Sequence, residues 1–188
     1  MTGDGAATRD RLIAAAVTLF QARGYHAVGL SEILSKARAP KGSLYHHFPG
    51  GKAELAEVAI EWLRDEIVGF LDGAAESGTP PGETISDIVR GTAKWLKANN
   101  FRQGALLAIL GQEVAAGDER VTAAVAHAYQ AVLQAFYRIL ATGDPPLGRG
   151  DAVAIIAMLD GAVAVCRATR STEPLRDVSA AIGKLLED

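Results

Sequence analysis

The eight residues from Lys41 to Phe48, Lys-Gly-Ser-Leu-Tyr-His-His-Phe, bring an ammonium group, two hydroxyls and two imidazoles together on a short stretch of chain. If this stretch is helical, Leu44 and Phe48 stand four residues apart on one face, and that face holds the helix on a core. The polar side chains then point outward: Lys41, Ser43, Tyr45 and His46. Cations, hydroxyls and ring groups are suited to contact phosphates and base edges. The pattern therefore predicts a DNA-binding helix.

A second short helix is predicted just before this one. Its apolar residues recur at helical spacing: Leu30, Ile33, Leu34 and Ala37. Pro40 then suits the first helical position of the next helix, where a missing N–H group is tolerated. Two short helices joined by a tight turn form a helix-turn-helix, whose second helix lies in the DNA major groove. We expect this motif to cover about residues 31–50.

The distribution of charge supports a DNA-binding segment at the start of the chain. The 188 residues carry a formal net charge of −3, which alone argues against a nucleic-acid ligand. Residues 1–52, however, hold seven lysines and arginines against three acidic residues, a local charge of +4, so the remainder carries −7. A basic footprint is what phosphate contact requires, and an acidic remainder discourages DNA from binding elsewhere.

Helical periodicity extends along nearly the whole chain, whereas alternation of period two is hard to find, so the fold class is predicted to be all-α. Hydrophobic residues make up 49% of the chain, enough for a packed core. A first helix should begin with Thr8 as its N-cap and end at Arg23, followed by Gly24. Further helices are expected over about 52–75, 80–98, 104–115, 121–140, 151–170 and 174–186.

The segment 151–170 is apolar on almost every face, and such a helix must be buried all round. Its most apolar stretch, 152–166, is too short to span a bilayer and is interrupted by Asp160 and Gly161. A helix of this kind near the end of a small all-α chain more often forms a subunit interface. We therefore expect a homodimer through the last two helices, with no membrane partner.

Cys166 is the single cysteine, so the chain forms no internal disulfide. Residues 1–8 are small and polar and lack the apolar core of a secretion signal. A soluble, cytoplasmic protein is predicted.

The sequence gives less support to other functions than to DNA binding. His46 and His47 point about 100° apart on a helix and lack a Cys or acidic partner at helical spacing, so no metal site is predicted, although a metal site or an inert surface remains an alternative. The chain has no Gly-x-Ser-x-Gly and no phosphate-cradling glycine loop, so neither catalysis nor a cofactor is expected. A helical ligand-binding or scaffold protein without DNA binding is the other open interpretation.

Over about residues 8–52 the chain resembles the TetR family of bacterial transcriptional regulators. The resemblance rests on Ala15-Ala16, Leu19-Phe20, Gly24-Tyr25, Ile33, the Lys41–Phe48 segment and Lys52. Within that family the Pro-Gly-Gly turn at residues 49–51 resembles the LmrA/YxaF-type subgroup. Residues 8–52 would form the helix-turn-helix domain, and residues 53–188 a ligand-binding and dimerisation domain.

The resemblance implies a homodimer that binds a palindromic double-stranded DNA operator, usually as a repressor, and leaves it when a small-molecule effector binds the body. By position, it implies recognition-helix contacts for Lys41, Gly42, Ser43, Tyr45 and His46. It likewise implies phosphate contacts for His47 and Lys52.

Two positions depart from the family pattern. Arg38 stands where the turn between the motif helices usually has glycine, so either the turn differs or Arg38 compensates with a phosphate contact. Val28-Gly29 replaces the usual Ser or Thr cap of the first motif helix, and Ser31 is the expected substitute for that hydroxyl.

The effector site is expected among aromatic and isolated polar residues of the body, because apolar pockets with few polar groups are typical ligand sites. The candidates are Trp62, Phe70, Trp95, Phe101, Gln112, Tyr129, Asp160 and Cys166. Each has a simpler interpretation as a core residue or a solvated side chain, and Glu113 is expected to be solvated. The composition favours a mainly apolar or aromatic effector, neutral or cationic rather than anionic.

Overall fold

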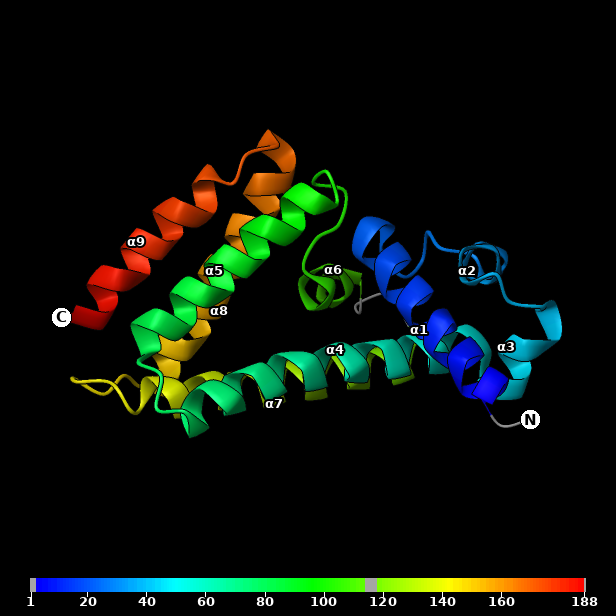
Figure 1. Cartoon of the computed structure of the whole chain (residues 1–188), viewed down its shortest axis with the longest axis horizontal. Helices are drawn as coiled ribbons and strands as arrows, with labels where there is room; N and C mark the ends of the chain where they lie inside the picture. Colours follow the sequence, from blue (N-terminus) through cyan, green and yellow to red (C-terminus); the bar gives the residue numbers. More distant parts are fainter. Residues whose placement is uncertain (1–2, 114–117, 188) are drawn as a thin grey trace. The chain divides into compact units, whose positions relative to one another are not determined.

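The computed structural model describes residues 3–113 and 118–187. Over these residues the secondary structure is entirely helical, which confirms the predicted all-α class (Figure 1). The helices are α1 Gly3–Arg23, α2 Leu30–Ala37, α3 Lys41–His47, α4 Gly51–Glu76, α5 Pro81–Ala98, α6 Leu106–Glu113, α7 Glu119–Leu140, α8 Arg149–Thr169 and α9 Glu173–Glu187. The end predicted for the helix over 104–115 lies outside the described residues.

The chain divides into two compact units. The first comprises Met1–Leu63 with Leu106–Ala128, and the second comprises Arg64–Ala105 with Tyr129–Asp188. Helices α4 and α7 each contribute residues to both units. These units are defined by which residues pack together. The predicted boundary between a DNA-binding domain ending at residue 52 and a ligand-binding domain starting at residue 53 concerns function and stays a prediction.

The first unit is built around a core that α1 shares with the two motif helices. Helix α1 packs against α2, α3 and α6. The largest fully buried side chains of this unit are Leu12, Phe20, Ile33, Leu44, Phe48, Leu55, Ile60, Leu106 and Leu110. Full burial of such a side chain is worth about 1.5–3 kcal/mol, so the core fixes α2 and α3 on α1.

Helix α1 ends as predicted but begins earlier than predicted. Gly24 has φ +79°, and its N–H donates to the carbonyl of Phe20 at 2.8 Å. The predicted N-cap at Thr8 is wrong, because α1 begins at Gly3 and Thr8 is buried within it. Ala6 and Ala7 are strong helix formers and nothing before Thr8 interrupts the helix. The Thr8 hydroxyl instead accepts a hydrogen bond from Arg11 at 2.8 Å.

The second unit is a layer of α5, α8 and α9 together with parts of α4 and α7. Helix α9 packs on both α5 and α8, and α5 also contacts α8 (Figure 1). The side chains buried between these three helices include Ile85, Leu96, Ile155, Cys166, Leu175 and Ile182. Helix α5 starts at Pro81 after Pro80, in agreement with the loop and start signals in the sequence.

Helix α8 departs from expectation, because it is not buried on every face within one chain. Val153 and Val165 are 47% and 49% exposed. Exposed small or apolar residues follow one stripe at helical spacing: Val153, Ala154, Ala157, Gly161, Ala164, Val165 and Ala168. Helices α5 and α9 pack against α8, whose buried residues include Ile155 and Cys166, and the stripe is left exposed. By length and composition alone α8 passes as a membrane span, but a helix that packs in a core passes the same test.

Candidate nucleic-acid interface

The turn between α2 and α3 has the left-handed conformation that usually takes glycine. Arg38 has φ 51° and ψ 43°, and its N–H donates to the carbonyl of Ser35 at 3.2 Å. The N–H of Ala39 reaches the carbonyl of Leu34 at 3.0 Å. Pro40 then caps α3 rather than occupying its first helical position, so the prediction for Pro40 is wrong by one residue. The structure thus places an arginine in a left-handed turn position, and the compensating phosphate contact expected of Arg38 stays a prediction.

Helix α3 presents its polar side chains outward, as the sequence predicts. Leu44 and Phe48 are 0% and 1% exposed, whereas Tyr45 is 61% exposed. Lys41, Gly42 and His46 are also exposed. A Cβ on Gly42 would meet no atom within 4 Å, so this stretch of backbone is open to an approaching ligand.

Ser43 and His47 are less free than their neighbours on α3. Ser43 is half-buried, and its hydroxyl donates to the carbonyl of Pro40 at 2.6 Å, which leaves its lone pairs as acceptors. His47 is half-buried, with its ring edge-on to His46 at 4.9 Å between centroids. Among the described residues no group of three or more His, Cys, Asp or Glu is placed to hold a metal ion.

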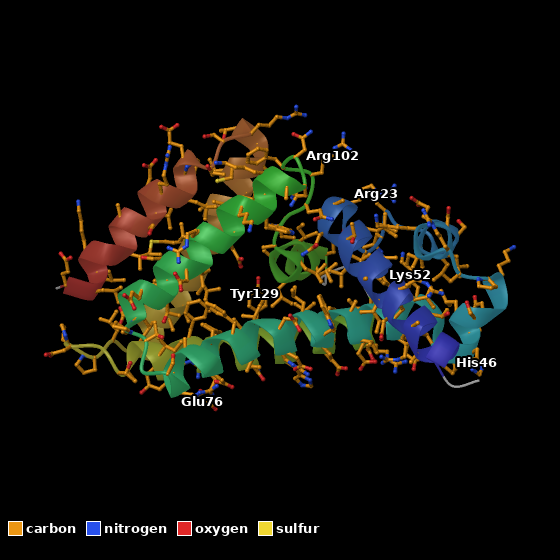
Figure 2. The ribbon with its side chains drawn as sticks, viewed as in Figure 1. Arg23, His46, Lys52, Glu76, Arg102 and Tyr129 are labelled. Carbon is orange, nitrogen blue, oxygen red and sulfur yellow. The ribbon has the colours of Figure 1, made fainter. Side chains whose placement is uncertain are left out.

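Lys52, near the start of α4, is half-buried rather than extended into solvent (Figure 2). Its ammonium nitrogen lies 4.2 Å from the centroid of the Tyr25 ring, a cation–π contact. Burial lowers the pKa of Lys52, and the nearby Glu113 carboxylate partly opposes that change. The predicted phosphate contact would therefore be made by a lysine that is already held in place.

Contacts from α1 hold α2 and support the end of α3. Arg23 forms an ion pair with Glu32, which lowers the pKa of that carboxyl, and Glu32 also accepts the N–H of Gly29 at 3.2 Å. The Arg11 guanidinium donates to the carbonyl of Ala37 at 3.2 Å. The Arg9 guanidinium lies 5.6 Å from the centroid of the Phe48 ring. The basic residues of α1 thus brace the motif, a role that charge counting did not distinguish from DNA contact.

The remaining predicted DNA contacts, Ser31 and Arg38, are both exposed on α2 and the turn after it. The exposed predicted residues thus belong to one continuous stretch of the first unit, from the start of α2 to the end of α3.

Of the eight predicted pocket residues, the structure brings Tyr129 and Asp160 into direct contact. The Tyr129 hydroxyl donates to Asp160 Oδ2 at 3.1 Å between α7 and α8. Burial raises the pKa of Tyr129, and the neighbouring Asp160 charge raises it further. Burial also raises the pKa of Asp160, and the hydrogen bond from Tyr129 partly opposes that rise. A half-buried carboxylate that hydrogen-bonds a phenol is a polar anchor in an otherwise apolar layer.

The other six are dispersed. Trp62 and Phe70 both lie on α4, and each is 46% exposed, so neither is a core residue of the single chain. Gln112 is exposed, and Trp95 and Phe101 are half-buried. Cys166 is fully buried, and burial raises the pKa of its thiol, which keeps it protonated.

One described pocket of about 260 Å³ lies on the second unit and was not predicted. Its lining residues are Gln130, Leu133, Gln134, Tyr137 and Arg149. Four of them lie within eight residues of α7, at spacings that place them on one side of the helix, and in the sequence such a mixed group is indistinguishable from a solvated face.

The expectation that Glu113 is solvated is wrong. Glu113 is half-buried at the end of α6, and its carboxylate accepts the backbone N–H of Tyr25 at 2.6 Å. Nothing local to residue 113 announces this contact, because its partner lies 88 positions away in the sequence.

Models of protein families match both ends of this architecture. Residues 12–59 match the bacterial regulatory proteins of the tetR family, and residues 81–181 match the LmrA/YxaF-like C-terminal domain of transcriptional regulators. The chain belongs to the TetR family. The LmrA/YxaF-like subgroup inferred from the Pro-Gly-Gly turn is thereby confirmed.

Relatives match along almost their whole length. The HTH-type transcriptional regulator LmrA of Bacillus subtilis (strain 168) is 29% identical over 182 residues, which cover 96% of this chain and 97% of LmrA. An HTH-type regulator of Mycobacterium tuberculosis is 32% identical over 189 residues, covering 95% and 93% of the two chains. The family and these relatives are transcriptional regulators, not enzymes.

Solved structures agree with the fold. The regulatory protein TetR from Rhodobacter sphaeroides superposes with a TM-score of 0.79 at 28% identity, covering 93% of this chain and 96% of that one. A TetR-family regulator from Agrobacterium tumefaciens, at 18% identity, gives a TM-score of 0.86 over 97% and 98% of the two chains, and so supports the fold alone.

Replacement of Arg38 by glycine separates stability from DNA contact. The left-handed conformation costs a non-glycine residue about 1 kcal/mol, so Arg38→Gly should raise the free energy of unfolding by up to about that amount. If Arg38 also contacts a phosphate, the same variant should bind DNA more weakly. Urea unfolding and a DNA titration measure the two effects, with Arg38→Ala as the control that removes the charge without relieving the backbone. A drop in stability on Arg38→Gly would contradict the strain argument.

Proposed function

We propose that this TetR-family regulator is a repressor that binds a palindromic operator as a homodimer and leaves it when a small effector occupies the second unit. The observation that supports it most strongly is the outward polar face of α3 above the buried pair Leu44 and Phe48. A DNA-binding transcriptional regulator is what the family membership establishes, and the finer roles below are inferences from this chain.

On α3, the exposed Lys41, Tyr45 and His46 are the residues that we assign to the major groove. Gly42 allows close approach of the backbone to DNA, since a Cβ there would stand in open space. Ser31 and Arg38, on the neighbouring helix and turn, and His47 and Lys52, at the other end of α3, are assigned to the phosphates that flank the groove.

Salt dependence tests the phosphate contacts. Each lost contact reduces the slope of log affinity against log salt by about one unit, so Lys41→Ala should flatten the slope by about one per subunit. A duplex selected from a random pool serves as the ligand, and Lys97→Ala, an exposed lysine at the end of α5, is the matched control. If the unmodified protein selects no sequence at low salt, the operator proposal fails.

The dimer is assigned to the exposed stripe on α8 together with α9. The stripe is apolar and built of small residues, which let a second helix approach closely, and Gly161 lies at its centre. Burying this stripe against a two-fold copy would complete the burial that the sequence of α8 predicts.

An arginine placed in this stripe should break the dimer. Ala157→Arg would bury an unpaired charge at a penalty of several kcal/mol, so monomers or aggregates should replace dimers at micromolar concentration. Light scattering measures the mass, and Ala98→Arg, at an exposed alanine at the end of α5, should remain dimeric. If the unmodified chain is a well-folded monomer, the proposed dimer through α8 and α9 is wrong.

The effector is inferred to be a mainly apolar or aromatic molecule that is neutral or cationic. The Tyr129–Asp160 pair offers it one carboxylate and one phenol in an apolar layer formed by α7 and α8. Burial raises the pKa of Asp160, so a donor or positive group of a ligand placed beside this carboxylate would stabilise its charged form. A cytoplasmic location follows from the proposed role.

Asp160→Asn should affect the free and the bound protein in opposite directions. Because burial raises the pKa of Asp160, ionisation above the ordinary aspartate pKa of about 3.9 costs folding free energy, so Asp160→Asn should raise the melting temperature at pH 7. Loss of a charged acceptor should weaken cationic aromatic ligands about tenfold or more and leave neutral ones nearly unchanged. Thermal shift across a panel of both classes measures this. Equal weakening of both classes would contradict the anchor, and ligands that stabilise the protein without releasing DNA would defeat induction.

A further inference from the structure

The end of α1 is completed by a residue from α6. After a helix ends on a left-handed glycine, the N–H of the next residue commonly bonds back to a carbonyl of the same helix. Here the glycine is Gly24, and the N–H of the next residue, Tyr25, instead donates to the Glu113 carboxylate at 2.6 Å. The contact is partly buried, and both residues belong to the first unit.

Space around this contact is tight. A Cβ built on Gly24 would overlap the Glu113 carboxylate, so this glycine is required by its neighbour as well as by its φ of +79°. The carboxylate therefore fills the position that a side chain at residue 24 would occupy. It touches the turn between α1 and α2 closely enough to fix that turn.

Tyr25 carries the contact to a residue assigned to DNA. Its ring lies tilted against the buried Phe20, with the centroids 5.7 Å apart, and edge-on to His26 at 5.3 Å. The Lys52 ammonium lies 4.2 Å from the Tyr25 ring centroid. Glu113 is close enough to Lys52 to favour its charged form. One carboxylate thus holds the amide of Tyr25 and favours the charge of the lysine that the Tyr25 ring supports.

A second contact ties the beginning of α7 to the beginning of α4. Arg120 forms an ion pair with Glu57, and a Cβ on Gly50 would come within 2.7 Å of the Arg120 guanidinium. The residues on both sides of the connection between α6 and α7 are thus joined to the DNA-reading part of the first unit, Glu113 to the turn after α1 and Arg120 to the helix after α3.

We propose that Glu113 is a positioning residue for DNA binding: it holds the turn after α1, and through Tyr25 it sets Lys52 for its phosphate. This inference rests on the proposed operator binding. Withdrawal of this carboxylate would release the Tyr25 amide and remove the support of the lysine together.

Paired substitutions at residue 113 test the proposal. Glu113→Ala removes the acceptor of the Tyr25 N–H and should weaken binding of the selected duplex about tenfold, because a hydrogen bond to a charged group is lost. The same variant should flatten the slope of log affinity against log salt by about one unit per subunit, because Lys52 loses its position. Glu113→Gln keeps an oxygen that can accept the Tyr25 N–H and should retain most of the affinity. Glu61→Ala, an exposed carboxylate on α4 in the same unit, is the control for lost negative charge.

Hydrogen exchange gives a readout that needs no DNA. The Tyr25 amide should exchange at least tenfold faster in Glu113→Ala than in the unmodified protein, and Glu113→Gln should stay close to the latter. If the unmodified protein binds DNA and Glu113→Ala changes neither the affinity nor the salt slope, the positioning role is overturned while the operator proposal stands. If the unmodified protein and its variants all fail to bind DNA, the operator proposal fails. If the Tyr25 amide exchanges equally fast in Glu113→Ala and in the unmodified protein, the contact between Glu113 and Tyr25 is overturned. If Glu113→Gln weakens DNA binding as much as Glu113→Ala, the positioning role is overturned as well.

Discussion

Burial of Leu44 and Phe48 is the constraint on which the DNA-reading surface depends. Helix α3 is only seven residues long, too short to be stable alone, so its orientation comes from these two side chains in the core of the first unit. Once Leu44 and Phe48 are buried, the helical geometry sets the direction of the other side chains of α3. The basic residues of α1 then serve the same core, since Arg11 and Arg23 bond to α2 and Arg9 lies over Phe48.

The fold was largely predictable because a helix is indicated by the spacing of apolar residues within its own segment. Apolar spacing located all the helices that the structure describes, and Gly24 marked the end of α1, where the left-handed backbone favours glycine. The errors arose where a local signal had a competitor. Thr8 resembles an N-cap, yet the alanines before it continue the helix. Helix α8 is apolar enough for complete burial, yet within a single chain its stripe is left exposed.

The sites were predictable to different degrees. The proposed DNA contacts from Ser31 to His47 lie on one continuous segment, so the outward face of α3 could be predicted from spacing and the remaining contacts from the family pattern. The left-handed backbone of Arg38 could be anticipated from the same pattern. A ligand site is assembled from separate helices, and only the Tyr129–Asp160 pair among its candidates is in direct contact. Glu113 shows the same limit, since the distant backbone N–H that it binds cannot be read from its own neighbours.

The contact between Glu113 and Tyr25 also restricts how freely such a chain can be recombined. The segment matched to the tetR-family model ends at residue 59, which invites its use as a portable module on an unrelated body. A module cut there would carry the Tyr25 amide away from its acceptor and leave Gly24 facing an empty space where a carboxylate had been. A chimaera that respects the sequence boundary would thus inherit an unsatisfied donor at the base of its DNA-reading surface. A functional graft must bring α6 along or rebuild an acceptor in its place.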